Sequence, residues 1–157
     1  MTDDPSLTRL PSRVVILVSQ YHERVTSRLL EGARDACREA GLTDTQVDVV
    51  QVPGAFELGV VAAAAARSDR YDCVIALGVV VRGETPHFEY VAGETSRVLA
   101  DVAAQELVPV GFGLLTTDTL DQALARAGGA AGNKGREAAE AALRAFAAVD
   151  WLLRDDA

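Results

Sequence analysis

The residues best suited to chemistry lie in one short segment, in which a histidine follows a glycine, an acid and a threonine. The segment reads Gly83-Glu84-Thr85-Pro86-His87. Because an imidazole exchanges protons near neutral pH, His87 is suited to acid–base catalysis. A histidine at the start of a helix can also simply bond to backbone or water, and from the residues alone the two interpretations carry equal weight.

The residues before His87 favour an anion site. The backbone of Gly83 and the hydroxyl of Thr85 lie where a helix is expected to begin, and helix amino termini attract phosphate. The segment lacks the glycine spacing of a P-loop or of a dinucleotide-binding fingerprint, and glycine turns before helices are common without ligands. Farther along, Arg126 and Lys134 flank a glycine-rich turn; either offers the positive charge that a phosphate needs, although most such charges are merely solvated.

Aromatic and acidic side chains follow the ends of other expected strands. Tyr21 and Phe56 either cover the core, which is the commoner outcome, or form a platform for a flat ring. Glu57 either accepts hydrogen bonds from a polyol or is a favourable acid in the first turn of a helix. Phe112 alternates within a strand, which favours packing, and His22 is interpreted as structural.

The elements that position these side chains are predicted by hydrophobic periodicity. Residues 73–81 form a nearly unbroken apolar run, which is typical of a strand buried on both faces of a parallel sheet. After Pro86, apolar residues recur every three or four positions, which predicts a helix that extends to about Glu106. Three more strands are expected, at residues 14–19, 47–52 and 108–115.

Helices alternate with these strands. They are expected from Val25 to a stop at Gly41, over residues 57–67, after a Thr119/Gln122 capping box, and in a last amphipathic segment that ends near Leu153. Gly128-Gly129 and residues 130–135 are expected to form a turn and a loop. The βαβαβαβ order, with two more helices, predicts a flavodoxin-like three-layer α/β/α sandwich with a four-stranded parallel sheet. The candidate residues should then converge at the rim where the strands end.

The composition suits one domain. With 157 residues, 49% of them hydrophobic, we expect a single domain at residues 13–157 after a flexible N-terminal tail at residues 1–12. The net charge of −8 argues against nucleic acid as a partner. No stretch suits a membrane span or a secretion signal, so we expect a cytoplasmic location. Cys37 and Cys73 are expected to be small buried hydrophobes, and no pattern resembles a metal site.

Four segments occur in a characteristic order. They are Val52-Pro53-Gly54-Ala55-Phe56-Glu57, Ala76-Leu77-Gly78-Val79-Val80-Val81-Arg82-Gly83-Glu84-Thr85-Pro86-His87-Phe88-Glu89-Tyr90, Phe112-Gly113-Leu114-Leu115-Thr116-Thr117-Asp118-Thr119 and Ala131-Gly132-Asn133-Lys134-Gly135. Together they closely resemble the 6,7-dimethyl-8-ribityllumazine synthase family. The resemblance covers residues 14–153, and because several motifs agree in order, it is far more specific than any one of them.

The resemblance implies a transferase of riboflavin biosynthesis. The family condenses 5-amino-6-(D-ribitylamino)uracil with 3,4-dihydroxy-2-butanone 4-phosphate, releasing phosphate and water, and it implies no metal or organic cofactor. By matching position, His87 is the implied proton-transfer residue. The implied phosphate-binding residues are Glu84, Thr85 and Arg126, with Lys134 as further support. The implied pyrimidine- and ribityl-binding residues are Tyr21, Ala55, Phe56, Glu57, Val79, Val80, Val81 and Phe112.

The family also implies an assembly. Its active site lies between subunits of a homopentamer, so Phe112 and Arg126 would come from the neighbour of the chain that supplies Tyr21 and His87. Some members form an icosahedral shell of sixty subunits, and riboflavin synthase is an implied partner. Residues 1–12 lack the β-forming stretch that many members lay across the adjacent subunit, so the sequence predicts no single size of assembly beyond the pentamer.

The sequence departs from the usual family pattern in a few places. Tyr21 stands where Phe or Trp is usual, and His22 takes a place often held by Asn. Two other functions remain as alternatives. A non-catalytic flavin- or lumazine-binding oligomer or shell protein is disfavoured by the intact His87, Thr85 and Arg126. A different phosphosugar enzyme of flavodoxin-like fold requires that the motif agreement be accidental.

Overall fold

Four parallel strands form the central sheet of the computed structural model, which describes residues 9–154. Their order across the sheet is β2-β1-β3-β4. The strands are β1 (Val14–Ser19), β2 (Val47–Val52), β3 (Cys73–Val81) and β4 (Val110–Thr117). The two central strands, β1 and β3, are buried along almost their whole length, which accounts for their apolar runs in the sequence.

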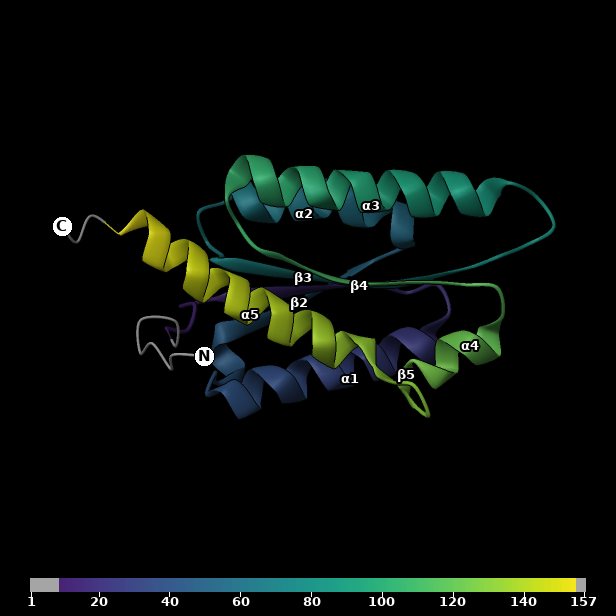
Figure 1. Cartoon of the computed structure of the whole chain (residues 1–157), viewed down its shortest axis with the longest axis horizontal. Helices are drawn as coiled ribbons and strands as arrows, with labels where there is room; N and C mark the ends of the chain where they lie inside the picture. Colours follow the sequence, from purple (N-terminus) through teal and green to yellow (C-terminus); the bar gives the residue numbers. More distant parts are fainter. Residues whose placement is uncertain (1–8, 155–157) are drawn as a thin grey trace.

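Helices cover both faces of the sheet, so the predicted flavodoxin-like three-layer sandwich is confirmed (Figure 1). The helices are α1 (Glu23–Ala40), α2 (Leu58–Arg67), α3 (His87–Glu106), α4 (Leu120–Ala125) and α5 (Lys134–Leu153). Figure 1 shows α2 and α3 on one face and α1, α4 and α5 on the other. Because strand side chains alternate between faces, Ile16 packs in the core under α1 and α5, whereas its neighbour Leu17 packs under α2.

The helix boundaries follow local signals in the sequence. Gly41 ends α1 as predicted, with φ at 111°, and its N–H donates to the carbonyl of Arg38. The predicted capping box starts α4, since Thr119 Oγ1 accepts from the N–H of Gln122 at 3.1 Å. Two short 3-10 turns, η2 (Asp44–Gln46) and η3 (Ala55–Glu57), precede β2 and α2, so the helix expected to begin at residue 57 begins at Leu58.

The fourth strand is displaced from its predicted position. The sequence predicts a strand at residues 108–115, whereas β4 begins at Val110 and ends at Thr117. Pro109 has no N–H for the ladder, although its carbonyl accepts from the N–H of Val74 at 2.9 Å. At the other end, β3 extends to Val81 and pairs there with Thr117, so β4 continues beyond its apolar run.

The glycine-rich segment after α4 contains more structure than predicted. Instead of a turn and a plain loop, β5 (Ala127–Gly129) and β6 (Gly132–Asn133) form a short antiparallel hairpin, and α5 begins at Lys134. The carbonyl of Leu29 in α1 lies so close to Gly135 that a Cβ atom there would be 2.0 Å away. A glycine is therefore required where α5 crosses α1.

The chain before β1 contacts the domain at the residues that the structure describes. Arg9 Nη1 lies 2.9 Å from Asp150 Oδ1, and Leu10 packs against the core. Residues 1–8 of the predicted tail lie outside the described residues. Among residues 9–154, no helix is long and apolar enough to cross a membrane. Cys37 and Cys73 are free and buried, as predicted, and burial raises the pKa of the Cys37 thiol to about 11.

Candidate active site at the carboxyl ends of the strands

A cavity of about 870 Å³, here called the rim cavity, lies where β1, β2 and β3 end. Its walls are the turn after β1, the turn η3, the last residues of β3 and the first turn of α3. The predicted site residues that line it are Tyr21, Ala55, Phe56, Glu57, Val79, Val80, Val81, Thr85 and His87. Segments far apart in the sequence therefore meet as the strand order requires, while the individual roles of these residues stay predictions.

Exposed aromatic rings form one part of the rim cavity. Tyr21, Phe56 and Tyr90 are 69%, 62% and 70% exposed, although all three carry large apolar surfaces. The backbone at Tyr21 is fixed by a hydrogen bond of 3.2 Å from its N–H to the carbonyl of Pro53. Exposed rings at the mouth of a cavity offer a platform for a flat ligand or for another protein surface.

His22 also lines this cavity, which the sequence did not lead us to expect. Its backbone is left-handed, with φ at 60° and ψ at 53°, and its carbonyl accepts the N–H groups of Val25 and Thr26 at the start of α1. Its ring meets that of Tyr21 edge to face, with centroids 4.6 Å apart. Its place beside Tyr21, directly after a strand end, was the signal that could have identified it.

Glu57 is held by the turn that presents it. Its Oε2 accepts the N–H of Gly54 at 3.1 Å; Gly54 is the N-cap of η3 and Glu57 is its last residue. Below them, the hydroxyl of Thr95 in α3 donates to the carbonyl of Ala55 at 3.4 Å. One carboxylate oxygen of Glu57 is therefore engaged with the backbone, and the other stays available to a hydroxyl-rich ligand.

The start of α3 brings together His87, the predicted proton-transfer residue, and Thr85, one of the predicted phosphate-binding residues. His87 is the first residue of the helix and is exposed. Its backbone N–H lies 3.5 Å from Thr85 Oγ1, and both residues line the rim cavity. The first N–H groups of a helix have no partners within it and carry partial positive charge. This arrangement can bind an anion beside an imidazole.

Arg82 braces the loop that carries these residues, a feature that the sequence analysis did not assign. Its Nε lies 2.9 Å from Asp118 Oδ1, and its Nη1 pairs with Glu89 in the first turn of α3. Its guanidinium also lies 4.3 Å from the centroid of the Phe88 ring. Hydrogen bonding from Arg82 lowers the pKa of Glu89. A charge placed directly at the end of an apolar strand was the available signal.

Four predicted residues do not line the rim cavity of this chain: Glu84, Phe112, Arg126 and Lys134. Phe112 lies on β4, at the edge of the sheet, and is 52% exposed. Arg126 follows α4 and donates from Nη1 to the carbonyl of Gln122 at 3.0 Å. Lys134 begins α5, and its Nζ lies 2.6 Å from Glu137 Oε2. Among the described residues, no arginine or lysine lines the rim cavity.

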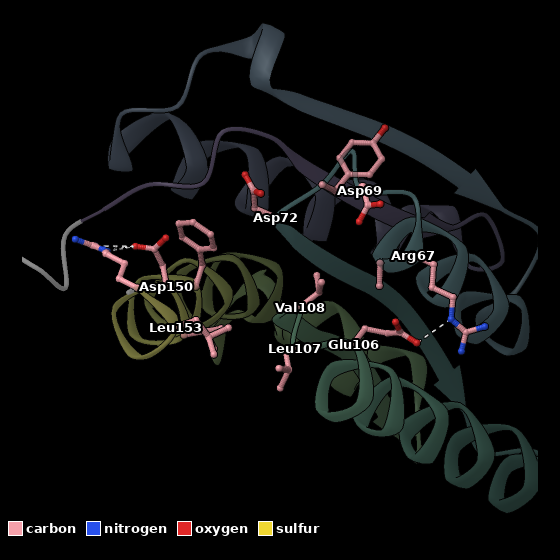
Figure 2. Close-up of a pocket in the computed structure, with 13 residues that line it drawn as sticks. Arg67, Asp69, Asp72, Glu106, Leu107, Val108, Asp150 and Leu153 are labelled. Atoms are coloured by element: carbon pink, nitrogen blue, oxygen red, sulfur yellow. Dashed lines mark hydrogen bonds and ion pairs between the residues drawn. The ribbon is translucent and has the colours of Figure 1, made fainter. Parts of the chain in front are cut away.

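Nothing in the described part of the chain suggests a metal centre, because residues 9–154 contain no group of three or more histidine, cysteine or acidic side chains arranged to hold an ion. A second cavity, of about 500 Å³, lies at the opposite end of the sheet. There Glu106 points toward Arg67, and the two form an ion pair of 2.7 Å (Figure 2). Asp150, in the same cavity, pairs with Arg154 at 2.7 Å.

Comparison with known proteins identifies the family of this chain. The family model of 6,7-dimethyl-8-ribityllumazine synthase matches residues 11–149. The 6,7-dimethyl-8-ribityllumazine synthase of Anaeromyxobacter sp. (strain Fw109-5) is 51% identical over 138 residues, 88% of this chain and 85% of that protein. The protein of the same name from Edwardsiella ictaluri (strain 93-146) is 53% identical over 133 residues, 84% of this chain and 85% of its own. This chain belongs to the 6,7-dimethyl-8-ribityllumazine synthase family.

Proposed function

We propose that the rim cavity is the active site in which this chain carries out the lumazine synthase reaction. The reaction condenses 5-amino-6-(D-ribitylamino)uracil with 3,4-dihydroxy-2-butanone 4-phosphate, and it yields 6,7-dimethyl-8-ribityllumazine, phosphate and water. One observation supports the assignment above all others: a ring platform, an imidazole and a helix amino terminus line the same cavity. The reaction needs each of these features.

The pyrimidine substrate fits the part of the cavity nearest β1 and β3. In our proposal its ring stacks on Tyr21, and the backbone of residues 79–81, which continues past the pairing of β1 with β3, bonds to its polar edge. The ribityl chain lies along Ala55, Phe56 and Glu57, where the second oxygen of the Glu57 carboxylate accepts hydroxyl protons. The ribityl hydroxyls therefore fix how far the pyrimidine enters.

The phosphate substrate fits the start of α3. Its phosphate lies against the turn at residues 83–85, where backbone N–H groups and the Thr85 hydroxyl bind it. His87 then lies beside the reacting carbon atoms. There it can remove a proton from the attacking amine and return one to a departing oxygen. Holding two substrates in this order also lowers the barrier, because the encounter of the reacting atoms becomes intramolecular.

We also propose that a neighbouring subunit completes the cavity. A departing phosphate dianion needs a cation, and the rim cavity of the described chain has none from arginine or lysine. Arg126 and Phe112 are placed away from their own cavity, and Phe112 is exposed on the edge strand. A homopentamer in which each chain gives Phe112, Arg126 and Lys134 to the next one accounts for both facts.

Further features of the proposal concern the setting of the enzyme. It works in the cytoplasm, without metal or organic cofactor, and transfers its product to riboflavin synthase. The pentamer either remains free or assembles into a sixty-subunit shell. Light scattering of the purified protein distinguishes a pentamer, a decamer and a shell by mass, because they contain five, ten and sixty subunits.

The direct test of the function is to mix the purified protein with both substrates and to record the absorbance or fluorescence of the lumazine product. We expect turnover that requires both substrates, and no rate above background would reject the proposal. The alternative, a flavin-storage oligomer, is tested by titrating riboflavin and following the fluorescence of the flavin. The tryptophan is a poor reporter, because Trp151 lies near the other end of the sheet, next to Asp150. Tight flavin binding without turnover would favour storage.

A further inference from the structure

Arg82 is the only residue of the described loop before α3 that joins three separate elements. It follows the last residue of β3, and its N–H donates to the carbonyl of Thr117 at the end of β4 at 2.8 Å. Its side chain reaches Glu89 in α3 and, at 2.9 Å, Asp118 in the turn before α4. Figure 1 shows both turns at the same end of the sheet.

The charge of Arg82 is already matched within this cluster. Two carboxylates share one guanidinium, so the three side chains together carry a net charge of about −1 near neutral pH. The Phe88 ring covers one face of the guanidinium at 4.3 Å. An arginine that is paired twice and stacked once presents little free charge to a phosphate. Arg82 is therefore better described as a strut, meaning a side chain that holds neighbouring segments together, than as an anion ligand.

Arg82 and its partners lie next to the loop that carries residues of the rim cavity. Residues 83–86, with Thr85 among them, form a loop whose two ends are Arg82 and the first turn of α3. The pair between Arg82 and Glu89 closes this loop across its base, beside His87. The pair with Asp118 connects the same base to the start of α4, because Asp118 directly precedes Thr119, the N-cap of α4.

We infer that Arg82 is a positioning residue, which holds the phosphate-binding loop and His87 in their working arrangement through Glu89, Asp118 and Phe88. The inference rests on the proposed function of the rim cavity. Because α4 leads to Arg126, the same strut sets the start of the helix that would carry Arg126 toward the neighbouring subunit. A loosened strut should therefore affect catalysis more than folding.

The test compares Arg82→Met, Glu89→Ala and Asp118→Ala by the steady-state kinetics of both substrates. If Arg82 is a strut, all three variants lower kcat, by roughly tenfold for Arg82→Met and by about threefold for each acid, since each acid variant leaves one pair intact. If Arg82 instead binds the phosphate, removing either acid frees its charge, and the KM of the phosphate substrate falls. That fall would overturn the inference.

Arg97 supplies a matched control. It also pairs with two carboxylates, Glu94 at 2.9 Å and Asp101 at 2.8 Å, but all three residues lie within α3. Arg97→Met therefore removes the same number of ion pairs without separating any elements, and we expect kcat within about twofold of wild type. Equal kcat losses in Arg82→Met and Arg97→Met would also overturn the inference.

Two further measurements keep the result clear if a variant is unstable. Arg82→Lys keeps the charge but cannot make both pairs and the stacking contact, so we expect a kcat between those of wild type and Arg82→Met. Thermal unfolding of each variant separates a lost fold from a displaced loop. Wild-type kcat in a folded Arg82→Met protein would refute the strut. Absence of turnover in the wild-type protein would instead refute the proposed function.

Discussion

The two ends of the sheet differ in what their charged and polar groups do. At the amino ends of the strands, the groups around the smaller cavity are bound to one another: Arg67 to Glu106, and Asp72 to the backbone of Ser12 and Arg13. At the carboxyl ends, the rim cavity has exposed rings and an imidazole at a helix start. At the amino ends, charged groups bind other groups of the same chain. At the carboxyl ends, the rings and the imidazole are exposed and can contact a ligand.

This difference separates a structural cavity from a functional one better than size or shape does. Ion pairs between neighbouring side chains satisfy both charges, so a cavity lined by them gains little from an added ligand. A helix amino terminus or an exposed ring, by contrast, gains a partner only when a ligand or another subunit arrives. Mutations at the carboxyl end should therefore change catalysis, and mutations at the amino end should change stability alone.

The largest effect is expected for His87→Ala. Removing the imidazole should lower kcat by about tenfold to a hundredfold with the KM of both substrates changed by less than about threefold, since proton transfer contributes to the transition state more than to binding. Steady-state kinetics with each substrate varied measures both constants. Wild-type kcat in a folded His87→Ala protein would show that the imidazole does not transfer the proton.

Arg126→Ala should chiefly weaken binding of the phosphate substrate. Loss of a charged hydrogen-bond donor to a dianion should raise the KM of that substrate by roughly tenfold or more and leave the affinity for the pyrimidine nearly unchanged. Separate KM measurements for the two substrates test this. Equal increases in both would mean that Arg126 maintains the assembly rather than binding phosphate, and light scattering would then show a change in mass.

Tyr21→Ala should weaken pyrimidine binding by about threefold to tenfold, because a stacked ring contributes on the order of 1 kcal/mol. Tyr21→Phe keeps the ring and its edge contact with His22, so it should bind the pyrimidine as wild type does. Inhibition by a non-reactive pyrimidine analogue measures the affinity without turnover. If the alanine variant binds the analogue normally, Tyr21 is not the platform.

At the amino end, Tyr71→Phe should leave kcat and KM unchanged and lower the free energy of unfolding by about 1 kcal/mol or less. The Tyr71 hydroxyl donates to Asp48 Oδ2 at 2.7 Å, and this hydrogen bond, with a second one from Arg13, lowers the pKa of Asp48. A lowered pKa in the folded state stabilises the protein above the ordinary aspartate value of 3.8. That stabilisation is lost as the pH falls through the lowered pKa.

Urea unfolding at several pH values tests the Tyr71 prediction. The difference in unfolding free energy between wild type and Tyr71→Phe should be present at pH 7 and should shrink below about pH 3.8. A constant difference over the whole range would mean that the hydroxyl acts through packing and not through Asp48. A loss of turnover in this variant would contradict the division between the two ends of the sheet.

The sequence predicted the layers of the fold because each central strand carries its own signal. An apolar run bounded by charged or polar residues identified β1 and β3 to the residue, since both strands are buried on both faces. It failed at β4, where the last two residues, Thr116 and Thr117, are placed by pairing with β3 rather than by their own hydrophobicity. The hydrophobic pattern also missed the hairpin of β5 and β6, because three of residues 128–132 are glycines and give no strand signal.

The candidate site shows the same limit. His87 and Thr85 were predicted because both lie in a segment that leads from a strand into a helix. Arg82 and His22 were not assigned a role at the site, since what they contact depends on residues brought close by the fold, such as Asp118 for Arg82. The placement of Arg126 outside its own cavity was implied only by the family resemblance, because sequence spacing by itself does not say which cavity a side chain faces.

The central claim is that each site takes its imidazole and its guanidinium from different chains, and mixed oligomers test it most directly. His87→Ala and Arg126→Ala chains, each with its own tag, are co-expressed and purified through both tags. The rate is measured with the phosphate substrate well below its wild-type KM, where loss of either residue slows a site. Random mixing should then restore about one quarter of the wild-type rate, because one interface in four joins an intact His87 to an intact Arg126. Mixing His87→Ala with the double variant should restore nothing. Oligomers that contain both single variants yet show no recovery would contradict the account, because both groups would then have to come from one chain.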